Sequence, residues 1–383
     1  MRIGITCYPT YGGSGVVATE LGMELAARGH EVHFITYASP IRLVGDTGRI
    51  RYHEVEVSSY PLFQYPPYCL ALASRMAEVA ESANLDLLHV HYAVPHSISA
   101  LLASQMLSER RRLTFITTLH GTDVTLVGTE PSYFPITQFA IEQSPGLTSI
   151  SQHLKARTIE VFGTRNPIEV IPNFVNCDLY QRIDDPELRT RYAAPDERIL
   201  VHLSNFRPVK RVLDCIRILA SVVEEIPARL LMIGDGPDRS AAEALAHRLG
   251  LQDRVLFLGK QQQVSQLLGL SDLLLLPSEM ESFGLAALEG MACGVPAIAS
   301  HVGGLPELVT DGIDGRLLPP GDVAGAARVV IELLADPKAL TAMGAAARRT
   351  AETRFCSDRI VPRYEAYYRQ VLAMNGGRRS ATA

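Results

Sequence analysis

The sequence carries little excess charge of either sign. Its 383 residues include 36 Lys and Arg and 41 Asp and Glu, which gives a formal net charge of −5 at pH 7. Because bulk binding of nucleic acid requires a basic face, the composition predicts no nucleic-acid partner. Any site for an anion must therefore be local, built from a few cations and backbone N–H groups.

Paired cysteines are also missing. The six cysteines are scattered, and none stands in a Cys-x-x-Cys pair. This excludes a disulfide framework or a zinc site of the usual spacing and is typical of buried small side chains in a reducing compartment. The six are Cys7, Cys69, Cys177, Cys215, Cys293 and Cys356.

Long apolar runs are absent as well. The apolar run at the N-terminus ends at Tyr8 and Pro9, which is too short for the core of a secretory signal. No stretch approaches the roughly 18 apolar residues of a membrane-spanning helix. These absences predict a cytoplasmic protein without a membrane partner.

What the chain does have is the composition of a globular protein, with 47% hydrophobic and 20% charged residues. At roughly 100–200 residues per domain, its length suggests about two domains. Apolar strands alternate with loops and helical segments, which is typical of parallel sheets covered by helices on both faces. The first half is predicted to hold strands at Arg2–Thr6, Glu31–Thr36, Leu87–His91, Thr114–Leu119 and Leu147–Ile150, and a helix at Gly15–Arg28.

A second cycle of the same kind starts near Ile199, after a linker at Asn166–Asp178 that includes a last strand of the first half at Ile168–Ile171. The predicted domains are residues 1–170 and 171–355. A helix over residues 356–375 is a candidate to pack back on the first domain, and residues 378–383 are expected to fray. The second half is predicted to hold strands at Ile199–Ser204, Arg229–Ile233, Val255–Leu258, Leu273–Pro277 and Pro296–Ala299, and helices at Val212–Val223, Ala241–Arg248, Val264–Leu268 and Gly284–Cys293.

A glycine-rich loop follows the first strand. Gly12, Gly13, Ser14 and Gly15 precede a predicted helix, so they can present N–H groups and a hydroxyl to a phosphate or carboxylate. A dinucleotide loop is one alternative, but the spacing differs and the second strand ends in Thr36–Ser39 without an acid for the ribose. A purely structural turn is the other alternative.

Two glutamates flank the start of an apolar helix in the second half. Glu281 falls in a loop at the end of a strand, and Glu289 falls inside the helix, beside Leu288 and Met291. A charge in such a helix is costly without a partner, and the two hydroxyls of a ribose are a suitable one. A nearby arginine is the structural alternative.

A cluster of cations follows the first strand of the second half. Arg207, Lys210 and Arg211 lie within the segment Ser204–Arg211. Arginine clamps phosphate oxygens and lysine acts as a point charge, so the cluster suits a phosphorylated ligand. A solvated helix start is the alternative, although cations at a helix N-terminus oppose its dipole.

Polar residues also end a strand of the first half. Thr117–Asp123 contains hydroxyls and His120, which suit a ligand with many hydroxyls, while a capped turn with a satisfied histidine is the alternative. Strand alternation puts His89 and His91 on one face. No carboxylate stands near them at ligand spacing and no Asp-x-Asp pair occurs, so no metal site is predicted.

The segment from Glu281 to Glu289, with Phe283 and Gly284 between, resembles the Glu-x7-Glu motif of the retaining family 4 glycosyltransferases. The glycine loop, His120-Gly121, the Arg207/Lys210 cluster, Gly234–Pro237 and Gly303–Glu307 agree with it, so the resemblance covers nearly the whole chain. It implies the α/β GT-B fold, with two Rossmann-like doubly wound domains that face a central cleft. It also implies a retaining, metal-independent hexosyltransferase that uses a nucleotide sugar and no cofactor.

Within that family, the N-terminal half looks like the members that transfer N-acetylglucosamine from UDP-GlcNAc to L-malate in the first step of bacillithiol biosynthesis. The stretches that carry this likeness are Ile3–Pro9, Gly12–Val17, Phe63–Tyr68, His89–Ala93 and Thr117–Asp123. Three alternatives stay open: another acceptor (inositol phosphate, a sugar or a lipid-linked molecule), a UDP-GlcNAc 2-epimerase, or a regulator that binds nucleotide sugars without catalysis. The sequence leaves the oligomeric state open, a homo-oligomer included.

The resemblance implies roles for the donor side. Lys210 and a neighbouring arginine would hold the diphosphate; the family's usual arginine position is Asn205 here, and Arg207 is the candidate replacement. Glu289 would bind the ribose. The remaining donor contacts would come from Glu281 and the N–H groups of Phe283, Gly284 and Leu285 to the sugar and phosphate, and from His120 to the sugar near its 6-hydroxyl.

For the acceptor, Ser14, Tyr92 and Thr118 are the candidates to donate hydrogen bonds, because they lie at strand ends of the first half, and Tyr65 and Tyr68 are candidates for the wall. The sequence singles out no cation of this half for the malate carboxylates. The glycine loop, including Gly13, would close over the diphosphate and the acceptor. The acceptor hydroxyl would attack from the face that the diphosphate leaves, with no protein nucleophile and no metal. The catalytic set implied in this way is His120, Glu281, Lys210 and Arg207.

Overall fold

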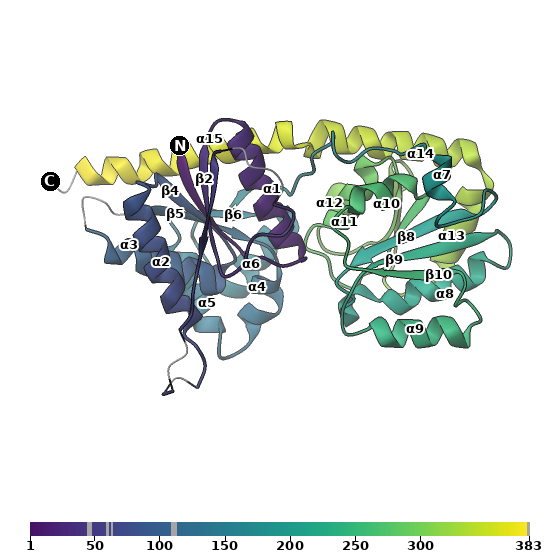
Figure 1. Cartoon of the computed structure of the whole chain (residues 1–383), viewed down its shortest axis with the longest axis horizontal. Coiled ribbons are helices and arrows are strands. Elements are labelled where there is room, and N and C mark those ends of the chain that lie inside the picture. Colours follow the sequence, from purple (N-terminus) through teal and green to yellow (C-terminus); the bar gives the residue numbers. More distant parts are fainter. Residues whose placement is uncertain (44–47, 59–60, 63, 109–112, 381–383) are drawn as a thin grey trace. The chain divides into compact units, whose positions relative to one another are not determined.

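The computed structural model describes residues 1–43, 48–58, 61–62, 64–108 and 113–380. The chain divides into two compact units (Figure 1), the first formed by Met1–Pro172 with Ile360–Ala383 and the second by Asn173–Arg359. Each unit is built on one parallel sheet with helices packed against it, the Rossmann-like architecture that the alternation of strands and helices predicts.

The sheet of the first unit has seven parallel strands in the order β3-β2-β1-β4-β5-β6-β7. The central strands β1, β4 and β5 are almost fully buried, because both of their faces are covered. The strands are β1 (Arg2–Thr6), β2 (Glu31–Thr36), β3 (Ile50–Glu54), β4 (Leu87–His91), β5 (Thr114–Leu119), β6 (Gly146–Ser149) and β7 (Glu169–Val170).

The helices of the first unit follow these strands. The first begins at Gly13, two residues before the predicted start, so Gly13 and Ser14 lie in its first turn. The helices are α1 (Gly13–Ala27), α2 (Tyr68–Ser82), α3 (Ile98–Met106), α4 (Thr122–Thr125), α5 (Phe134–Gln143) and α6 (Gln152–Phe162), with short η1 (Ala93–Ser97) and η3 (Val127–Thr129).

The C-terminal helix α15 (Ser357–Ser380) belongs to the first unit from Ile360 on. Its Tyr364 and Tyr368 are fully buried, and its Glu365 accepts hydrogen bonds from His30 Nε2 at 2.7 Å and Arg28 Nη2 at 3.1 Å. The helix is bounded by Ser357 and Ser380, and the expectation of a frayed end over residues 378–383 stays a prediction. Residues 381–383 lie outside the described part of the chain.

The sheet of the second unit has six parallel strands in the order β10-β9-β8-β11-β12-β13. Its strands are β8 (Arg198–Ser204), β9 (Ala228–Gly234), β10 (Val255–Gly259), β11 (Leu273–Leu276), β12 (Ala297–Ser300) and β13 (Gly315–Leu318). Its helices are α7 (Pro186–Arg189), α8 (Val212–Val222), α9 (Arg239–Arg248), α10 (Val264–Leu270), α11 (Leu285–Ala292), α12 (Leu305–Leu308), α13 (Val323–Ala335) and α14 (Pro337–Thr350), with short η4 (Pro208–Lys210) and η5 (Ala351–Phe355).

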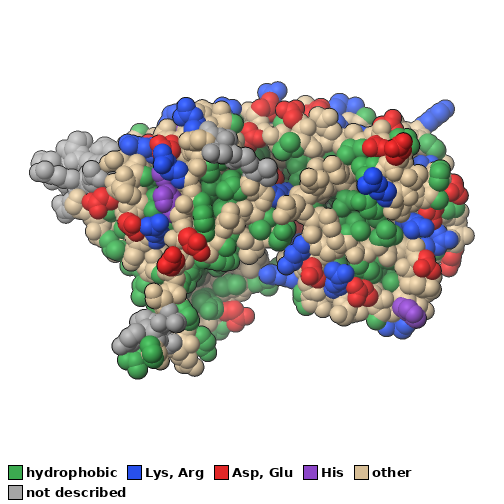
Figure 2. Space-filling model, viewed as in Figure 1, with side chains coloured by type: hydrophobic (Ala, Val, Ile, Leu, Met, Phe, Trp, Pro, Cys, Tyr) green, Lys and Arg blue, Asp and Glu red, His purple; other side chains and the backbone are tan. Residues whose placement is uncertain are grey.

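The surface of each unit is mixed in charge. Figure 2 shows Lys and Arg interspersed with Asp and Glu on the visible face of both units. This mixture agrees with the small net charge of the sequence. Within the described residues, no helix is long and apolar enough to cross a bilayer.

Candidate active site

The loops after β8, β9, β11 and β12 lie at the carboxyl edge of the second sheet, and glycines let them pack backbone against backbone. A Cβ on Gly234 would lie 1.8 Å from the carbonyl oxygen of Ser204, and one on Gly303 would lie 1.7 Å from that of Glu281. Both glycines also have positive φ, +121° and +58°. Only glycine fits either position, so these residues fix the loops that carry Lys210 and Glu281.

Lys210 and Glu281 form an ion pair at this edge. Lys210 Nζ lies 2.6 Å from Glu281 Oε1, and the same oxygen accepts a hydrogen bond from Ser278 Oγ at 2.9 Å. The two side chains are only 19% and 11% exposed. The structure therefore brings together two residues that the sequence placed in separate motifs, 71 positions apart.

Glu289 is buried in α11, as its apolar neighbours indicated. Its Oε1 accepts a hydrogen bond from the hydroxyl of Tyr180 at 2.7 Å. Tyr180 is thus a partner of Glu289 in addition to the ribose and the arginine that the sequence suggested. It is a candidate functional residue that the sequence did not indicate. A tyrosine hydroxyl donates a hydrogen bond to the carboxylate without cancelling its charge.

The three cations of the Ser204–Arg211 segment differ in their partners. Arg211 has positive φ and donates through Nε to Asp214 Oδ2 at 2.7 Å, so its charge is already compensated within the unit. Arg207 is exposed, while Lys210 is paired with Glu281. A contact of Arg211 with the diphosphate stays a prediction, and in this structure its partner is Asp214.

Asn205 stands directly after β8, beside these cations. Its Oδ1 is buried and has no hydrogen-bond partner among the residues that the structure describes. The backbone oxygen of Asn205 lies against Gly236, where an added Cβ would come within 2.0 Å. The residue at the family's usual arginine position is thus held rigidly, with an unused acceptor.

The start of α11 carries the remaining donor residues. Gly284 caps this helix in the left-handed region, with φ of +97°, and Leu285 is its first residue. Phe283 is buried and packs edge-on against Phe355, with ring centroids 5.7 Å apart. A helix N-terminus presents backbone N–H groups without intrahelical partners, so this turn can donate to an anion or a hydroxyl.

In the first unit, the glycine loop leads straight into α1. An added Cβ on Gly15 would lie 2.4 Å from the carbonyl oxygen of Tyr8, so the loop folds tightly onto the helix start. Gly13 is exposed, and Ser14 Oγ donates to the hydroxyl of Tyr92 at 3.2 Å. The structure therefore brings together two of the predicted acceptor residues, which lie 78 positions apart.

His120 lies at the end of β5, only 8% exposed, and its Nε2 is 2.8 Å from Nδ1 of His91. The rings of His89 and His91 stack with centroids 4.4 Å apart, which confirms that these two residues share a face. Burial lowers the pKa of His89 and of His120 to about 3. Both rings are therefore neutral near pH 7 and act as hydrogen-bonding groups rather than cations.

Thr118 does not reach the surface of this site. Its side chain is fully buried, and its Oγ1 lies 2.6 Å from both His89 Nε2 and Thr148 Oγ1. The hydroxyl is thus part of the packing between strands and is not positioned to contact an acceptor directly. The expectation of an acceptor contact from Thr118 is corrected accordingly.

Asp123 was not singled out from the sequence, although it ends the Thr117–Asp123 segment. It is buried and accepts hydrogen bonds from the backbone N–H groups of Ala93, His120 and Gly121 at 3.2, 3.2 and 2.9 Å. Burial raises its pKa to about 6. The carboxyl group ties the turn after β5 to the segment after β4, so it holds His120 in place.

Tyr65 is 78% exposed, whereas Tyr68 is partly buried at the start of α2. Phe63, the first residue of the Phe63–Tyr68 stretch, lies outside the described residues. Across the described ranges, no group of three or more His, Cys, Asp or Glu side chains could hold a metal ion.

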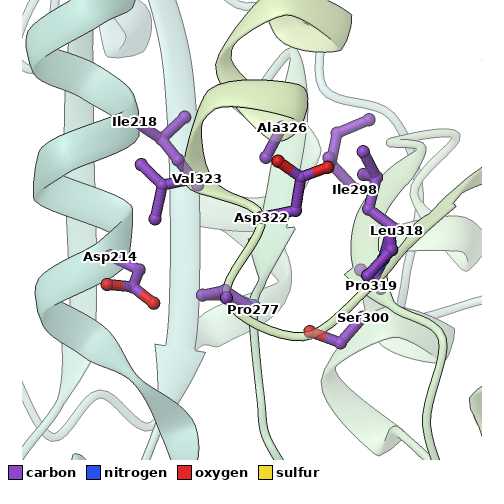
Figure 3. Close-up of a pocket in the computed structure, with 12 residues that line it drawn as sticks. Asp214, Ile218, Pro277, Ile298, Ser300, Leu318, Pro319, Asp322, Val323 and Ala326 are labelled. Carbon is purple, nitrogen blue, oxygen red and sulfur yellow. The ribbon is translucent and has the colours of Figure 1, made fainter.

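A small pocket lies elsewhere in the second unit (Figure 3), between the starts of α8 and α13 and the ends of β12 and β13. Its volume of ≈ 20 Å³ is room for about one water molecule. Its polar lining comes from Asp214, Ser300 and Asp322, and Asp214 is already paired with Arg211. The pocket includes none of the predicted donor residues and is not a candidate for the nucleotide-sugar site.

The comparisons with known proteins agree with this architecture. Residues 11–179 match the family model described as Glycosyltransferase Family 4, and residues 184–350 match the model described as Glycosyl transferases group 1. A relative from Bacillus anthracis, N-acetyl-alpha-D-glucosaminyl L-malate synthase, is 50% identical over 373 residues, 97% of each chain. D-inositol 3-phosphate glycosyltransferase from Mycobacterium tuberculosis is 28% identical over 374 residues, 89% of this chain and 75% of that one.

Solved structures share the fold at low sequence identity. Sucrose-phosphate synthase from Thermosynechococcus elongatus matches with a TM-score of 0.79 at 23% identity, covering 98% of this chain and all of the other. HepE from Anabaena in complex with UDP and glucose matches with a TM-score of 0.79 at 21% identity, covering 96% and 98% of the two chains. The chain therefore belongs to glycosyltransferase family 4 and has the GT-B fold of two Rossmann-like domains.

Proposed function

We propose that this glycosyltransferase moves N-acetylglucosamine from UDP-GlcNAc to the hydroxyl of L-malate with retention, the first step of bacillithiol biosynthesis. The observation that carries the proposal is the 50% identity to N-acetyl-alpha-D-glucosaminyl L-malate synthase over 97% of both chains. The local geometry supports it, because the second unit offers contacts for a nucleotide diphosphate and the first offers neutral hydrogen-bonding groups for a sugar and an acceptor.

On the donor side, Glu289 would accept hydrogen bonds from the ribose hydroxyls while it keeps the hydrogen bond from Tyr180. Lys210 would turn from Glu281 to the diphosphate, whose two negative charges compete for it more strongly than one carboxylate. Glu281 is then free to accept hydrogen bonds from the sugar. The N–H groups at the start of α11 add partial positive charge toward the same phosphate.

The residues around Lys210 complete this proposal. Arg207 is exposed, so its side chain can reach toward the diphosphate. The Oδ1 of Asn205 can accept a hydrogen bond from a ligand or a bound water. Positive charge from Lys210, Arg207 and the helix start would stabilise the leaving diphosphate, which is electrostatic catalysis. We propose that these groups suffice without a metal ion.

In the transfer step, the bond between C1 of the sugar and the phosphate oxygen breaks, and a bond from C1 to the malate hydroxyl oxygen forms on the same face. The hydroxyl proton passes to an oxygen of the departing UDP, so no protein nucleophile is consumed. Ser14 and Tyr92 would orient the malate, and His120 would hold the sugar. Gly13 is exposed and has no side chain, so a ligand oxygen could approach the backbone of the first turn of α1 closely.

The test is release of UDP from UDP-GlcNAc by the purified protein with malate, inositol phosphate or water as acceptor, with and without EDTA. Malate-dependent UDP, a product of GlcNAc-malate mass with an α-anomeric linkage and insensitivity to EDTA are expected. A rate with malate no higher than with water would overturn the proposal. Preferred use of inositol phosphate would reassign the acceptor, and formation of UDP-N-acetylmannosamine would indicate an epimerase.

A matched pair of variants tests the donor site. Glu281→Gln should lower kcat/KM for UDP-GlcNAc by about 100-fold, because it removes both the charge that orients Lys210 and an acceptor for the sugar. Glu279→Gln changes an exposed carboxylate in the same loop and should leave the rate unchanged. Equal rates for the two variants would remove Glu281 from the proposed site.

A further inference from the structure

Histidines gather at the carboxyl ends of β4 and β5 in the first unit. His89, His91, His96 and His120 are all buried, at 0%, 0%, 0% and 8% exposure. Burial lowers the pKa of each, to about 3 for His89 and His120, to about 4 for His96 and well below its usual value for His91. The four rings are therefore neutral, and each carries one N–H.

The hydrogen bond between His91 and His120 allows two arrangements of that proton. The bond joins His91 Nδ1 to His120 Nε2 at 2.8 Å. In the first arrangement His91 donates through Nδ1–H, so the proton of His120 sits on its other nitrogen, Nδ1. In the second arrangement His120 donates through Nε2–H, so the proton of His91 sits on Nε2 and the Nδ1 of His120 is a bare acceptor.

The surroundings of His91 distinguish the two arrangements. His91 Nε2 is buried and has no hydrogen-bond partner among the described residues. The second arrangement would leave an N–H donor at Nε2 without an acceptor, whereas the first leaves an unprotonated nitrogen at that position. Buried N–H groups without a partner are rarer in native structures than acceptors without one. The structure therefore favours Nδ1–H on His91.

His96 shows that this part of the unit tolerates a bare Nε2. Its Nδ1 faces the backbone carbonyl oxygen of His91, which can only accept, so His96 must carry Nδ1–H. Its Nε2 is then unprotonated, and it too is buried without a partner among the described residues. The carbonyl thus sets in His96 the same tautomer that we assign to His91.

Packing prevents His91 from turning to exchange its nitrogens. Its ring is stacked between His89, with centroids 4.4 Å apart, and His120, with centroids 5.0 Å apart. His89 is itself held at both nitrogens, by the hydroxyl of Tyr368 at 2.7 Å and by Thr118 Oγ1 at 2.6 Å. His89, on the other side of His91 from His120, is therefore held in place within the core of the unit.

We infer that His91 is a positioning residue that sets the tautomer of His120, so that His120 presents Nδ1–H as a hydrogen-bond donor to an oxygen of the transferred sugar. His91 itself touches no substrate. That the sugar accepts this hydrogen bond rests on the proposed function. The assignment of the tautomer rests only on the geometry around His91. The donor role fits a neutral imidazole, which can hold a hydroxyl or ring oxygen without adding charge.

The tautomer can be measured directly in the unaltered protein. Histidine labelled with ¹⁵N distinguishes protonated from unprotonated ring nitrogens in long-range ¹H–¹⁵N spectra, and the loss of signals in His120→Asn assigns the residue. We expect Nδ1 of His120 to carry the proton and Nε2 to be bare. A protonated Nε2 on His120 would overturn the inference, whatever the variants below do.

Two substitutions of His91 test its consequence. In His91→Asn the amide nitrogen takes the place of Nδ1 and keeps the donor, while His91→Leu removes it at similar bulk. We expect His91→Leu to lower kcat/KM for UDP-GlcNAc by about tenfold, as for one lost hydrogen bond, and His91→Asn to recover most of that loss. The affinity for UDP alone should not change in either variant, since the proposed UDP contacts lie in the second unit. Equal losses in both variants would show that His91 merely fills space.

The acceptor assay separates failure of this inference from failure of the proposed function. If the wild-type protein transfers to an acceptor other than malate, the proposed function fails, yet the His91 variants can be compared on that acceptor and the spectrum stands unchanged. If malate is the acceptor but His120 carries its proton on Nε2, only the present inference fails.

Discussion

Replacing Gly303 by alanine tests whether the backbone packing of the second unit sets the position of Glu281. Gly303 has φ of +58°, and an added Cβ would lie 1.7 Å from the carbonyl oxygen of Glu281. Gly312 offers a matched control in the same unit, because its φ is +75° but nothing lies within 4 Å of an added Cβ. The two substitutions share the cost of the left-handed backbone and differ in the collision.

The magnitudes follow from these two contributions. A left-handed alanine costs about 1–2 kcal/mol, and this cost applies to both variants. Because real Cβ atoms essentially never approach a neighbour within 3.0 Å, the loop carrying Glu281 must also move by more than 1 Å in Gly303→Ala. Overpacking of this kind adds about 1–3 kcal/mol. A displacement of about 1 Å at a reacting centre can cost about 100-fold in rate.

The expected results are therefore distinct. Gly312→Ala should lose about 1–2 kcal/mol in urea unfolding and keep its kcat/KM. Gly303→Ala should lose about 2–5 kcal/mol and about 100-fold in kcat/KM for UDP-GlcNAc, measured at a temperature where both variants are folded. If the Gly303 variant matched the Gly312 variant in both stability and rate, the loop after β12 would not position Glu281.

Two further results are expected. Tyr180→Phe should weaken UDP binding by about tenfold in calorimetry, because it removes the hydroxyl that orients buried Glu289; unchanged affinity would make the pair structural. The stability of the protein should fall between pH 7 and pH 5. Since His89 and His120 have folded pKa values of about 3, below the usual 6.5, each loses about 2 kcal/mol of stability over that interval. Asp123, with its pKa raised to about 6, adds about 1 kcal/mol to the free energy of unfolding over the same interval and so offsets part of the loss. A urea midpoint that does not change between these pH values would contradict the burial of neutral histidines.

The fold was largely predictable because its central strands are short, apolar and separated by helical periodicity. The strands that sequence reasoning missed, β3 (Ile50–Glu54) and β13 (Gly315–Leu318), lie at the edges of their sheets. The first is largely exposed, with polar side chains in Arg51 and His53, so it lacks the apolar run that marks a buried strand. Edge strands gain their structure from a neighbour, and that neighbour is not visible in the local sequence.

The candidate site was predictable only to the level of strand ends. The rule that parallel sheets bind ligands at their carboxyl edge directed attention to Lys210, Glu281 and Glu289, and the structure pairs the first two at that edge. It could not identify Tyr180 as the partner of Glu289, because the two residues are 109 positions apart and no motif links them. The pairing of Arg211 with Asp214 was within reach, since residues three apart on a helix start are neighbours.

The histidine network shows which piece of information was missing. Alternation places His89 and His91 on one face of β4, but it does not say what lies opposite. The register of β4 against β5 shows what lies opposite. His91 pairs with Thr118, so His120 lies two residues further along on the same face. The same register turns Thr118 inward toward His89, where its hydroxyl joins the packing of the strands. Register arises from the pairing of strands rather than from either strand alone. The residue proposed to face the ligand, His120, and the one that supports the sheet, Thr118, therefore cannot be told apart until the strands are paired.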